Sequence, residues 1–194
     1  MPHITQQNWI FDMDGTLTIA KHDFDAIRTA LGLPEGLPIL ESLAQLPAEK
    51  SIPLHQQLNE IELEVAKRSE PAPYAAQLLQ SLTARGANIG ILTRNNAQNI
   101  HVTLEAAGLL QYFSSENLLS RECATPKPAP DGIFQLLNKW QADTQDAVMV
   151  GDYIHDLAAG RNAQVTTIYV DHQGLFPFKA SADICVQSLA ELLD

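Results

Sequence analysis

The chain has 194 residues, of which 45% are hydrophobic and 18% are charged. This is the composition of an ordinary globular protein and the length of one domain, or of one domain with a modest insertion, which excludes collagen, long coiled coils and wholesale disorder. Lys and Arg total 12 against 23 Asp and Glu, so a net charge of −11 argues against nucleic acids and anionic membranes as partners.

Four short apolar segments, rich in β-branched residues, are each followed by polar residues or glycine. They are Trp9–Phe11, Ile89–Leu92, Ala147–Val150 and Thr166–Val170. They show no alternation of apolar and polar residues, which is typical of strands covered on both faces, as in a parallel sheet.

Helical patterns separate the later strands. The spacing of apolar residues predicts helices over 96–107, 133–140 and 156–163, with Asp156 as the N-cap of the last. Strands that alternate with helices indicate an α/β fold with a doubly wound parallel sheet.

The connection between the first and second strands is far longer than a usual crossover. Helical spacing within it predicts helices over 24–31, 39–46 and 54–65, and a fourth helix over 74–85 leads into the second strand. We interpret residues 18–70 as a small helical subdomain, here called the helical insert. Residues 1–17 and 71–194 would form the core.

The two cysteines, Cys123 and Cys185, have neither a metal-ligand spacing nor the pattern of a disulfide framework. The N-terminal segment does not resemble a signal peptide, and the apolar runs are too short to span a bilayer. These features predict a cytoplasmic protein with reduced thiols and no membrane partner.

Polar side chains follow three of the predicted strands. Asp12 and Asp14 follow the first, Thr93 follows the second, and Asp152 and Asp156 follow the third. Ligands bind at the carboxyl ends of the strands in such sheets, so these residues should share one crevice. Crowded carboxylates repel one another unless a cation neutralises them, and Mg²⁺ prefers oxygen ligands.

Four motifs in this order resemble those of the haloacid dehalogenase superfamily. They are Asp12-Met13-Asp14-Gly15-Thr16-Leu17, Thr93 at the end of Ile-Leu-Thr, Lys127 in Thr-Pro-Lys-Pro, and the Gly-Asp-x-x-x-Asp pattern of Gly151-Asp152 and Asp156. The resemblance covers nearly the whole chain and is strongest to phosphoglycolate-phosphatase-like members of subfamily I. It implies a Rossmann-like core, and the helical insert resembles the C1-type cap of that subfamily.

The resemblance implies a phosphatase that forms an aspartyl-phosphate on Asp12, with Asp14 as general acid and base. Thr93, Lys127 and the backbone at Gly15 and Thr16 would hold the phosphoryl group. Mg²⁺ would be bound by Asp12, the backbone carbonyl of Asp14, and Asp152, with Asp156 ordering the site. The cap-side candidates for substrate contact are His22 and Arg28, and the candidates beside Thr93 are Arg94 and Asn95.

Other interpretations compete with these roles. Thr93 could instead cap the helix that starts near Asn96, and Lys127 could be a solvated loop lysine. A β-phosphoglucomutase-like phosphosugar mutase would carry the same motifs, whereas a dehalogenase would not need Asp14. A receiver domain would have a shorter chain without an insert, and a non-catalytic relative that binds phosphorylated ligands is a further alternative.

The substrate expected from these residues is a small phosphorylated metabolite, and the expected assembly is a monomer or a small homo-oligomer. Only 81 residues separate Asp12 from Thr93, which is short for a full C1-type cap. We therefore expect a reduced insert that selects the organic part of the substrate.

Overall fold

A six-stranded, wholly parallel sheet lies at the centre of the computed structural model, which describes residues 4–193. The strand order is β3-β2-β1-β4-β5-β6. The strands are β1 (Asn8–Phe11), β2 (Asn88–Leu92), β3 (Leu118–Leu119), β4 (Ala147–Gly151), β5 (Thr166–Val170) and β6 (Ile184–Val186). The predicted fold class and all four predicted strands are confirmed. The edge strands β3 and β6 were not predicted, because two and three residues carry no recognisable pattern.

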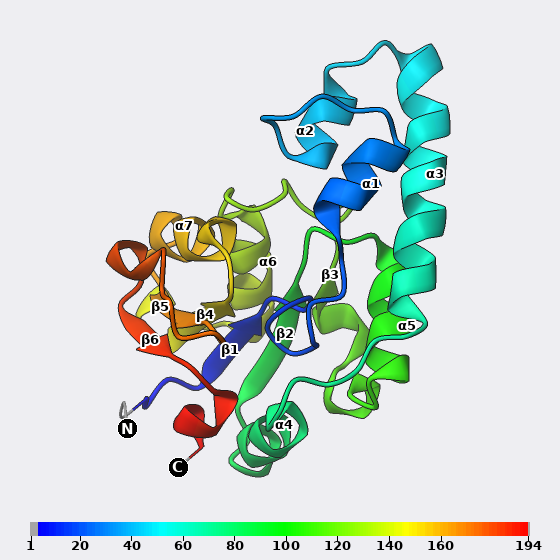
Figure 1. The fold of residues 1–194 in the computed structure, drawn as a ribbon. Coiled ribbons are helices and arrows are strands. Elements are labelled where there is room, and N and C mark those ends of the chain that lie inside the picture. Colours follow the sequence, from blue (N-terminus) through cyan, green and yellow to red (C-terminus); the bar gives the residue numbers. More distant parts are fainter. Residues whose placement is uncertain (1–3, 194) are drawn as a thin grey trace.

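Helices cover both faces of the sheet, as expected for a doubly wound fold (Figure 1). They are α4 (Ala75–Ala84), α5 (Ala97–Ala106), α6 (Asp131–Trp140) and α7 (Ile154–Asn162). Short 3₁₀ helices complete the connections: η1 (Leu110–Tyr112), η2 (Ser115–Asn117), η3 (Thr144–Asp146), η4 (Lys179–Ser181) and η5 (Leu189–Leu192). Residues of α4 and α5 share one apolar cluster with the sheet, and residues of α6 and α7 share a second one.

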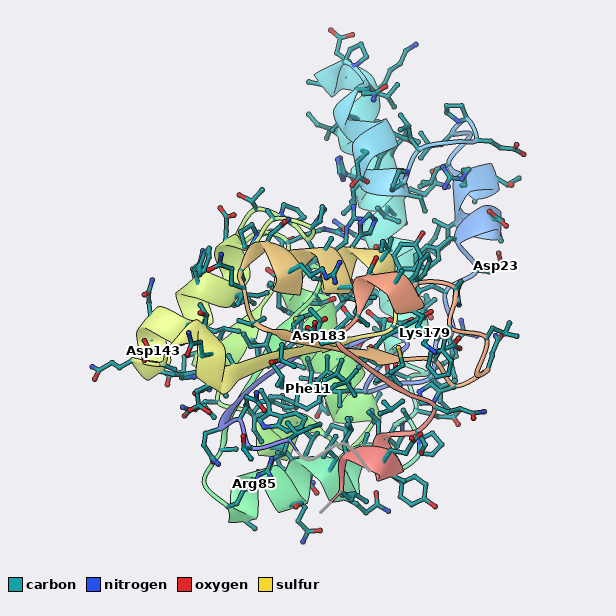
Figure 2. All side chains as sticks on the ribbon, turned by 90° about the vertical axis from the view of Figure 1, so that its left-hand side faces the viewer. Phe11, Asp23, Arg85, Asp143, Lys179 and Asp183 are labelled. Atoms are coloured by element: carbon teal, nitrogen blue, oxygen red, sulfur yellow. The ribbon has the colours of Figure 1, made fainter. Side chains whose placement is uncertain are left out.

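The central strand β1 shows why its sequence lacks polar alternation. Trp9 and Phe11 belong to the α4/α5 cluster, whereas Ile10, between them, belongs to the α6/α7 cluster. Successive side chains of a strand point to opposite faces, and here both faces are buried, so all three residues are inaccessible to solvent. Phe11 lies at the middle of the molecule (Figure 2).

The helical insert holds α1 (Phe24–Ala30), α2 (Ile39–Ala44) and α3 (Ala48–Ala66), which stand together at one end of the sheet (Figure 1). They enclose a separate apolar cluster made of Ile27, Leu31, Ile39, Leu43 and Leu58. The two segments that connect the insert to the core lie side by side. The backbone N–H of Ile19 donates to the carbonyl of Glu70 at 3.0 Å, and that of Ala72 donates to the carbonyl of Leu17 at 2.8 Å.

Two predicted helix starts were wrong. Helix α3 begins six residues before Leu54, so Pro53 lies inside it. Helix α7 begins at Ile154 with Tyr153 at the N-cap position, so Asp156 is not the N-cap. Instead, the Asp156 side chain accepts a hydrogen bond from the backbone N–H of Tyr153 at 3.0 Å.

The 19-residue α3 is too polar to be a membrane span, and none of the other helices within residues 4–193 has both the length and the apolar character that a span requires. Cys123 and Cys185 are both free thiols, as the sequence predicted.

We predict that the helical insert can lose its own packing without loss of the sheet. Leu43 is fully buried in the insert's cluster, so Leu43→Ala should lower the free energy of unfolding of residues 24–66 by about 2–5 kcal/mol. Amide hydrogen exchange measures this, because exchange should accelerate in α1 to α3 and stay unchanged in β1 and β4. Leu79→Ala, at an equally buried position in α4, is the matched control and should accelerate exchange across the sheet. Equal effects of both variants on the sheet would contradict an independently packed insert.

Candidate functional site

A cavity of about 630 Å³ lies between the carboxyl ends of the strands and the helical insert. Ten of the residues selected from the sequence line it: Asp12, Asp14, His22, Arg28, Thr93, Arg94, Asn95, Lys127, Asp152 and Asp156. The first strand β1 pairs with both β2 and β4, so the strand order reverses here. This is the place where open α/β sheets bind ligands.

Lys127 is the cation at the centre of the site. Its Nζ lies 2.6 Å from Asp12 Oδ1 and 2.6 Å from Asp156 Oδ1, and the lysine is only 2% exposed. Burial alone would lower the pKa of this ammonium, but the two adjacent carboxylates outweigh burial and raise it. Lys127 is therefore charged, so the prediction of a positive charge beside Asp12 fits this geometry.

Three carboxylates form a cluster that fits a hard cation. Asp12, Asp152 and Asp156 each offer an oxygen, and these oxygens lie within 4.8 Å of one another. Burial, followed by the charge of Asp156, raises the pKa of Asp152 to about 7. Burial also raises the pKa of Asp12 despite the opposing effect of Lys127. One lysine thus does not balance the cluster, and oxygen ligands of this kind suit Mg²⁺.

Asp156 supports the cluster from behind. Oδ1 of Asp156 contacts Lys127, and Oδ2 accepts the hydrogen bond from the Tyr153 backbone. A Cβ at Gly151 would lie 2.2 Å from Cβ of Asp156, so only glycine allows this approach. Both oxygens of Asp156 have partners in the protein, which fits the expectation that this carboxylate orders the metal site.

The turn after Asp14 is shaped around Asp152. Gly15 has φ of +91°, and a Cβ there would lie 2.3 Å from Asp152 Oδ2. The Thr16 hydroxyl donates to Asp152 Oδ1 at 3.3 Å. Gly15 and Thr16 do not line the cavity, but they hold one of its carboxylates in place.

Asp14 stands apart from the three-carboxylate cluster. Its Oδ2 accepts a hydrogen bond from the Asn95 side-chain amide at 3.2 Å, and its Oδ1 lies 3.9 Å from Nδ1 of His22. The two predicted substrate contacts, Asn95 and His22, are thus placed beside the Asp14 carboxylate. They can orient it toward a group bound in the cavity.

Thr93 does not cap a helix, since the Asn96 side chain caps α5 by accepting from the backbone N–H of Asn99 at 2.8 Å. The Thr93 hydroxyl accepts from the backbone N–H of Asn95 at 3.0 Å and lines the cavity. Its neighbour Arg94 forms a 2.5 Å ion pair with Glu41 of α2, which joins the core to the insert.

Arg28 also lines the cavity, but its Nη1 donates to the backbone carbonyls of Pro34 at 3.2 Å and of Leu37. It therefore braces the loop between α1 and α2, a role the sequence did not predict.

The sequence analysis missed the residues that join α3 to the core. Both Nη1 contacts of Arg121 with Glu62 are 3.2 Å long, and Arg121 Nη2 donates to Asn59 at 2.8 Å. Burial raises the pKa of Glu62, partly offset by Arg121. These residues belong to no motif, and no spacing signal links α3 with a loop sixty residues away.

Comparisons with known proteins agree with this geometry. The family model described as haloacid dehalogenase-like hydrolase matches residues 21–170. An uncharacterized hydrolase of Saccharomyces cerevisiae is 28% identical over 95% of this chain and 88% of its own length. A phosphoglycolate phosphatase of Agrobacterium fabrum is 27% identical over 83% of this chain and 78% of its own. The crystal structure of a hydrolase from Pseudomonas syringae shares the fold with a TM-score of 0.78, at 21% identity over 97% of this chain and 98% of that one.

The carboxylate cluster predicts a pH-dependent stability in metal-free protein. The pKa of Asp152 in the folded state is raised to about 7 from 3.8, so its contribution is fully favourable below pH 3.8 and is lost as pH rises through 7. In EDTA, this contribution should therefore lower the thermal midpoint as the pH rises from about 4 to 7, and Asp152→Asn should reduce that fall. Asp143→Asn, an exposed position away from the insert (Figure 2), is the matched control and should keep the wild-type pH dependence. If the thermal midpoint of Asp152→Asn falls with pH as steeply as that of the wild type, the raised pKa of Asp152 is contradicted.

A second prediction concerns the shape of the turn at Gly15. Gly15→Ala and Gly108→Ala both place alanine at positive φ, which costs about 1 kcal/mol, but a Cβ at Gly108 meets nothing within 4 Å. Only Gly15→Ala should displace Asp152 and weaken Mg²⁺ binding, by about tenfold or more. Titration of the thermal midpoint with Mg²⁺ measures this. The idea fails if the two variants bind Mg²⁺ equally well.

Proposed function

The chain belongs to the haloacid dehalogenase-like hydrolases, and from this membership we propose that it is a Mg²⁺-dependent phosphatase that acts on a small phosphomonoester. The observation that carries the proposal is the position of Asp12, which lies in the cavity between Lys127 and Asp152. A carboxylate beside a charged lysine and a cation site is suited to attack on an anionic phosphate. The relative named as a phosphoglycolate phosphatase supports the same class of reaction.

In this proposal, Mg²⁺ is held by the carboxylates of Asp12 and Asp152 and by the backbone carbonyl of Asp14. When bound, it supplies the positive charge that offsets the repulsion between the Asp12 carboxylate and the phosphate. Lys127 and the Thr93 hydroxyl hold the phosphoryl oxygens. The backbone N–H groups of Gly15 and Thr16, which were also expected to do so, donate instead to the carbonyls of Thr18 at 2.9 Å and of Met13 at 3.4 Å.

Two carboxylates carry out the chemistry. The Asp12 carboxylate attacks phosphorus, and the bond between phosphorus and the ester oxygen breaks while Asp14 gives its proton to that oxygen. Asp14 then takes a proton from water as the water attacks the aspartyl-phosphate, which releases inorganic phosphate and restores Asp12. The contacts from Asn95 and His22 keep Asp14 aimed at the reacting group.

The helical insert acts as a cap over this chemistry. Residues 19–22 and 70–73 are the proposed hinge, since the paired connecting segments there are the covalent links between insert and core. Closure would exclude water before transfer and bring His22, Arg28 and the Arg94–Glu41 ion pair around the substrate. A small phosphorylated metabolite fits a cavity of about 630 Å³. We propose the cytoplasm as the site of action.

We predict that Asp12→Asn abolishes Mg²⁺-dependent phosphate release, because an amide cannot attack phosphorus. Asp14→Asn should lower kcat by about 10²–10⁴-fold through the loss of proton transfer. Both can be measured as inorganic phosphate released from a panel of phosphomonoesters, with Asp143→Asn as the control that retains wild-type rates.

The same panel distinguishes a phosphatase from a phosphosugar mutase. A mutase would convert a sugar phosphate into its isomer with little free phosphate, which product analysis would detect. Wild-type rates in Asp12→Asn, or full activity in EDTA, would refute the proposed mechanism.

A further inference from the structure

The side of the cavity formed by the helical insert is largely apolar. Its lining includes Phe24, Leu37, Pro38, Ile39, Leu40 and Leu58. Phe24 is 61% exposed and Leu37 is 42% exposed, although the insert buries Ile27, Ile39 and Leu58 in its own apolar cluster. Exposed apolar side chains gathered in a cavity favour an apolar ligand group.

This apolar wall is continuous with the reacting centre. The ring of His22 stacks on that of Phe24, with centroids 5.6 Å apart and planes 11° from parallel. The other side of His22 faces Asp14, at 3.9 Å between Nδ1 and Oδ1. An organic group attached to the ester oxygen near Asp14 would therefore pass along His22 to the Phe24 ring.

The charged residues around this wall do not favour a second anion. Of the arginines that line the cavity, Arg94 is paired with Glu41, and Arg28 donates to the carbonyls of Pro34 and Leu37. Glu62 places a further carboxylate in the lining.

We infer that the substrate is a phosphomonoester whose organic group is compact, apolar and free of a second anionic group, and this inference rests on the proposed phosphatase function. Carboxylated esters such as phosphoglycolate, and pyrophosphate, would place an unpaired charge against Phe24, Leu37 and Glu62. Arg28 is then a positioning residue, which holds Leu37 in the cavity through its backbone carbonyl.

The test compares kcat/KM for monoalkyl phosphates of one to five carbons with that for ω-carboxyalkyl phosphates of the same length, for pyrophosphate and for sugar phosphates. We expect kcat/KM to rise about fourfold for each added methylene group until the wall is covered. A terminal carboxylate should lower kcat/KM about tenfold or more relative to the alkyl phosphate of equal length. A flat alkyl series, or a preference for carboxylated, sugar or pyrophosphate substrates, would overturn the inference.

Variants test the residues named. Phe24→Ala and Leu37→Ala should reduce the gain in kcat/KM for each added methylene group. The loss of kcat/KM relative to wild type should therefore grow with the length of the alkyl chain. Ile52→Ala is the matched control, because Ile52 is an equally apolar residue of the insert, 67% exposed, that is not part of the lining. Ile52→Ala should keep the wild-type gain in kcat/KM for each methylene group. An equal loss of that gain in Ile52→Ala would overturn the placement of Phe24 and Leu37 against the substrate.

Arg28→Ala separates bracing from anion binding. If Arg28 braces the loop that carries Leu37, the loss of kcat/KM in Arg28→Ala should grow with alkyl chain length, as it does in Leu37→Ala. A loss confined to the carboxylated series would show that Arg28 binds an anionic tail and would overturn the inference. Failure of the proposed function has a different signature, since no phosphomonoester would then show hydrolysis that depends on both Mg²⁺ and Asp12.

Discussion

The site depends on the Lys127 ammonium, which is buried at 2.6 Å from both Asp12 and Asp156. Three carboxylates whose oxygens approach within 4.8 Å would otherwise repel one another in a medium that screens charge poorly. Removing one partner from a buried ion pair typically costs about 3–5 kcal/mol, because the remaining charge is left without compensation. Lys127 balances only part of the cluster, because one ammonium faces three carboxylates. Burial, and after it the charge of Asp156, raises the pKa of Asp152 to about 7. The negative charge that Lys127 does not balance makes the cluster attractive to a cation. The same charge keeps the Lys127 ammonium beside Asp12.

Backbone geometry makes this crowding possible. The order of the sheet places β1 next to β4, so Asp12 and Asp152 leave neighbouring strands at the same edge. Two glycines lack the Cβ atoms that would otherwise collide with the carboxylates. Gly15 lies beside Asp152, and Gly151 lies beside Asp156. A parallel sheet is well suited to hold such a crowded arrangement, because its strands are buried on both faces and cannot shift without disturbing two apolar clusters.

The sequence was most informative where chemistry and periodicity act over short distances. Buried strands such as β1 and β5 carry an unmistakable apolar pattern, and residues at strand ends could be assigned to one crevice because parallel strands end at a common edge. Contacts between distant segments left no comparable trace, so the bonds from Arg121 to Glu62 and Asn59 were missed. The position of Asp156 within α7 was also misjudged, because an aspartate that accepts from the N-cap backbone resembles, in sequence, one that caps the helix itself. The charge of Arg28 suggested a contact with an anionic substrate, whereas its bonds to Pro34 and Leu37 depend on a loop conformation that no local pattern encodes.

In the proposed function, the insert and the core divide substrate recognition between them for a physical reason. Groups that meet the phosphate must be fixed before the substrate arrives, and they stand on strands and on the loops that follow them. The insert has its own apolar cluster, and it meets the core where α3 packs against α5 and through polar contacts such as Arg94–Glu41 and Arg121–Glu62. Such pairs are individually weak when water can reach them, and Glu41 is 42% exposed, so this pair alone does little to hold α2 against the core. Arg121 and Glu62 are far less exposed, at 11% and 13%, so water screens this second pair less, and it holds α3 against the core more firmly. Under the proposed closure, the apolar wall carried by α1 and α2 would meet the ester group as these pairs form, which would couple selection of the organic group to exclusion of water from Asp12.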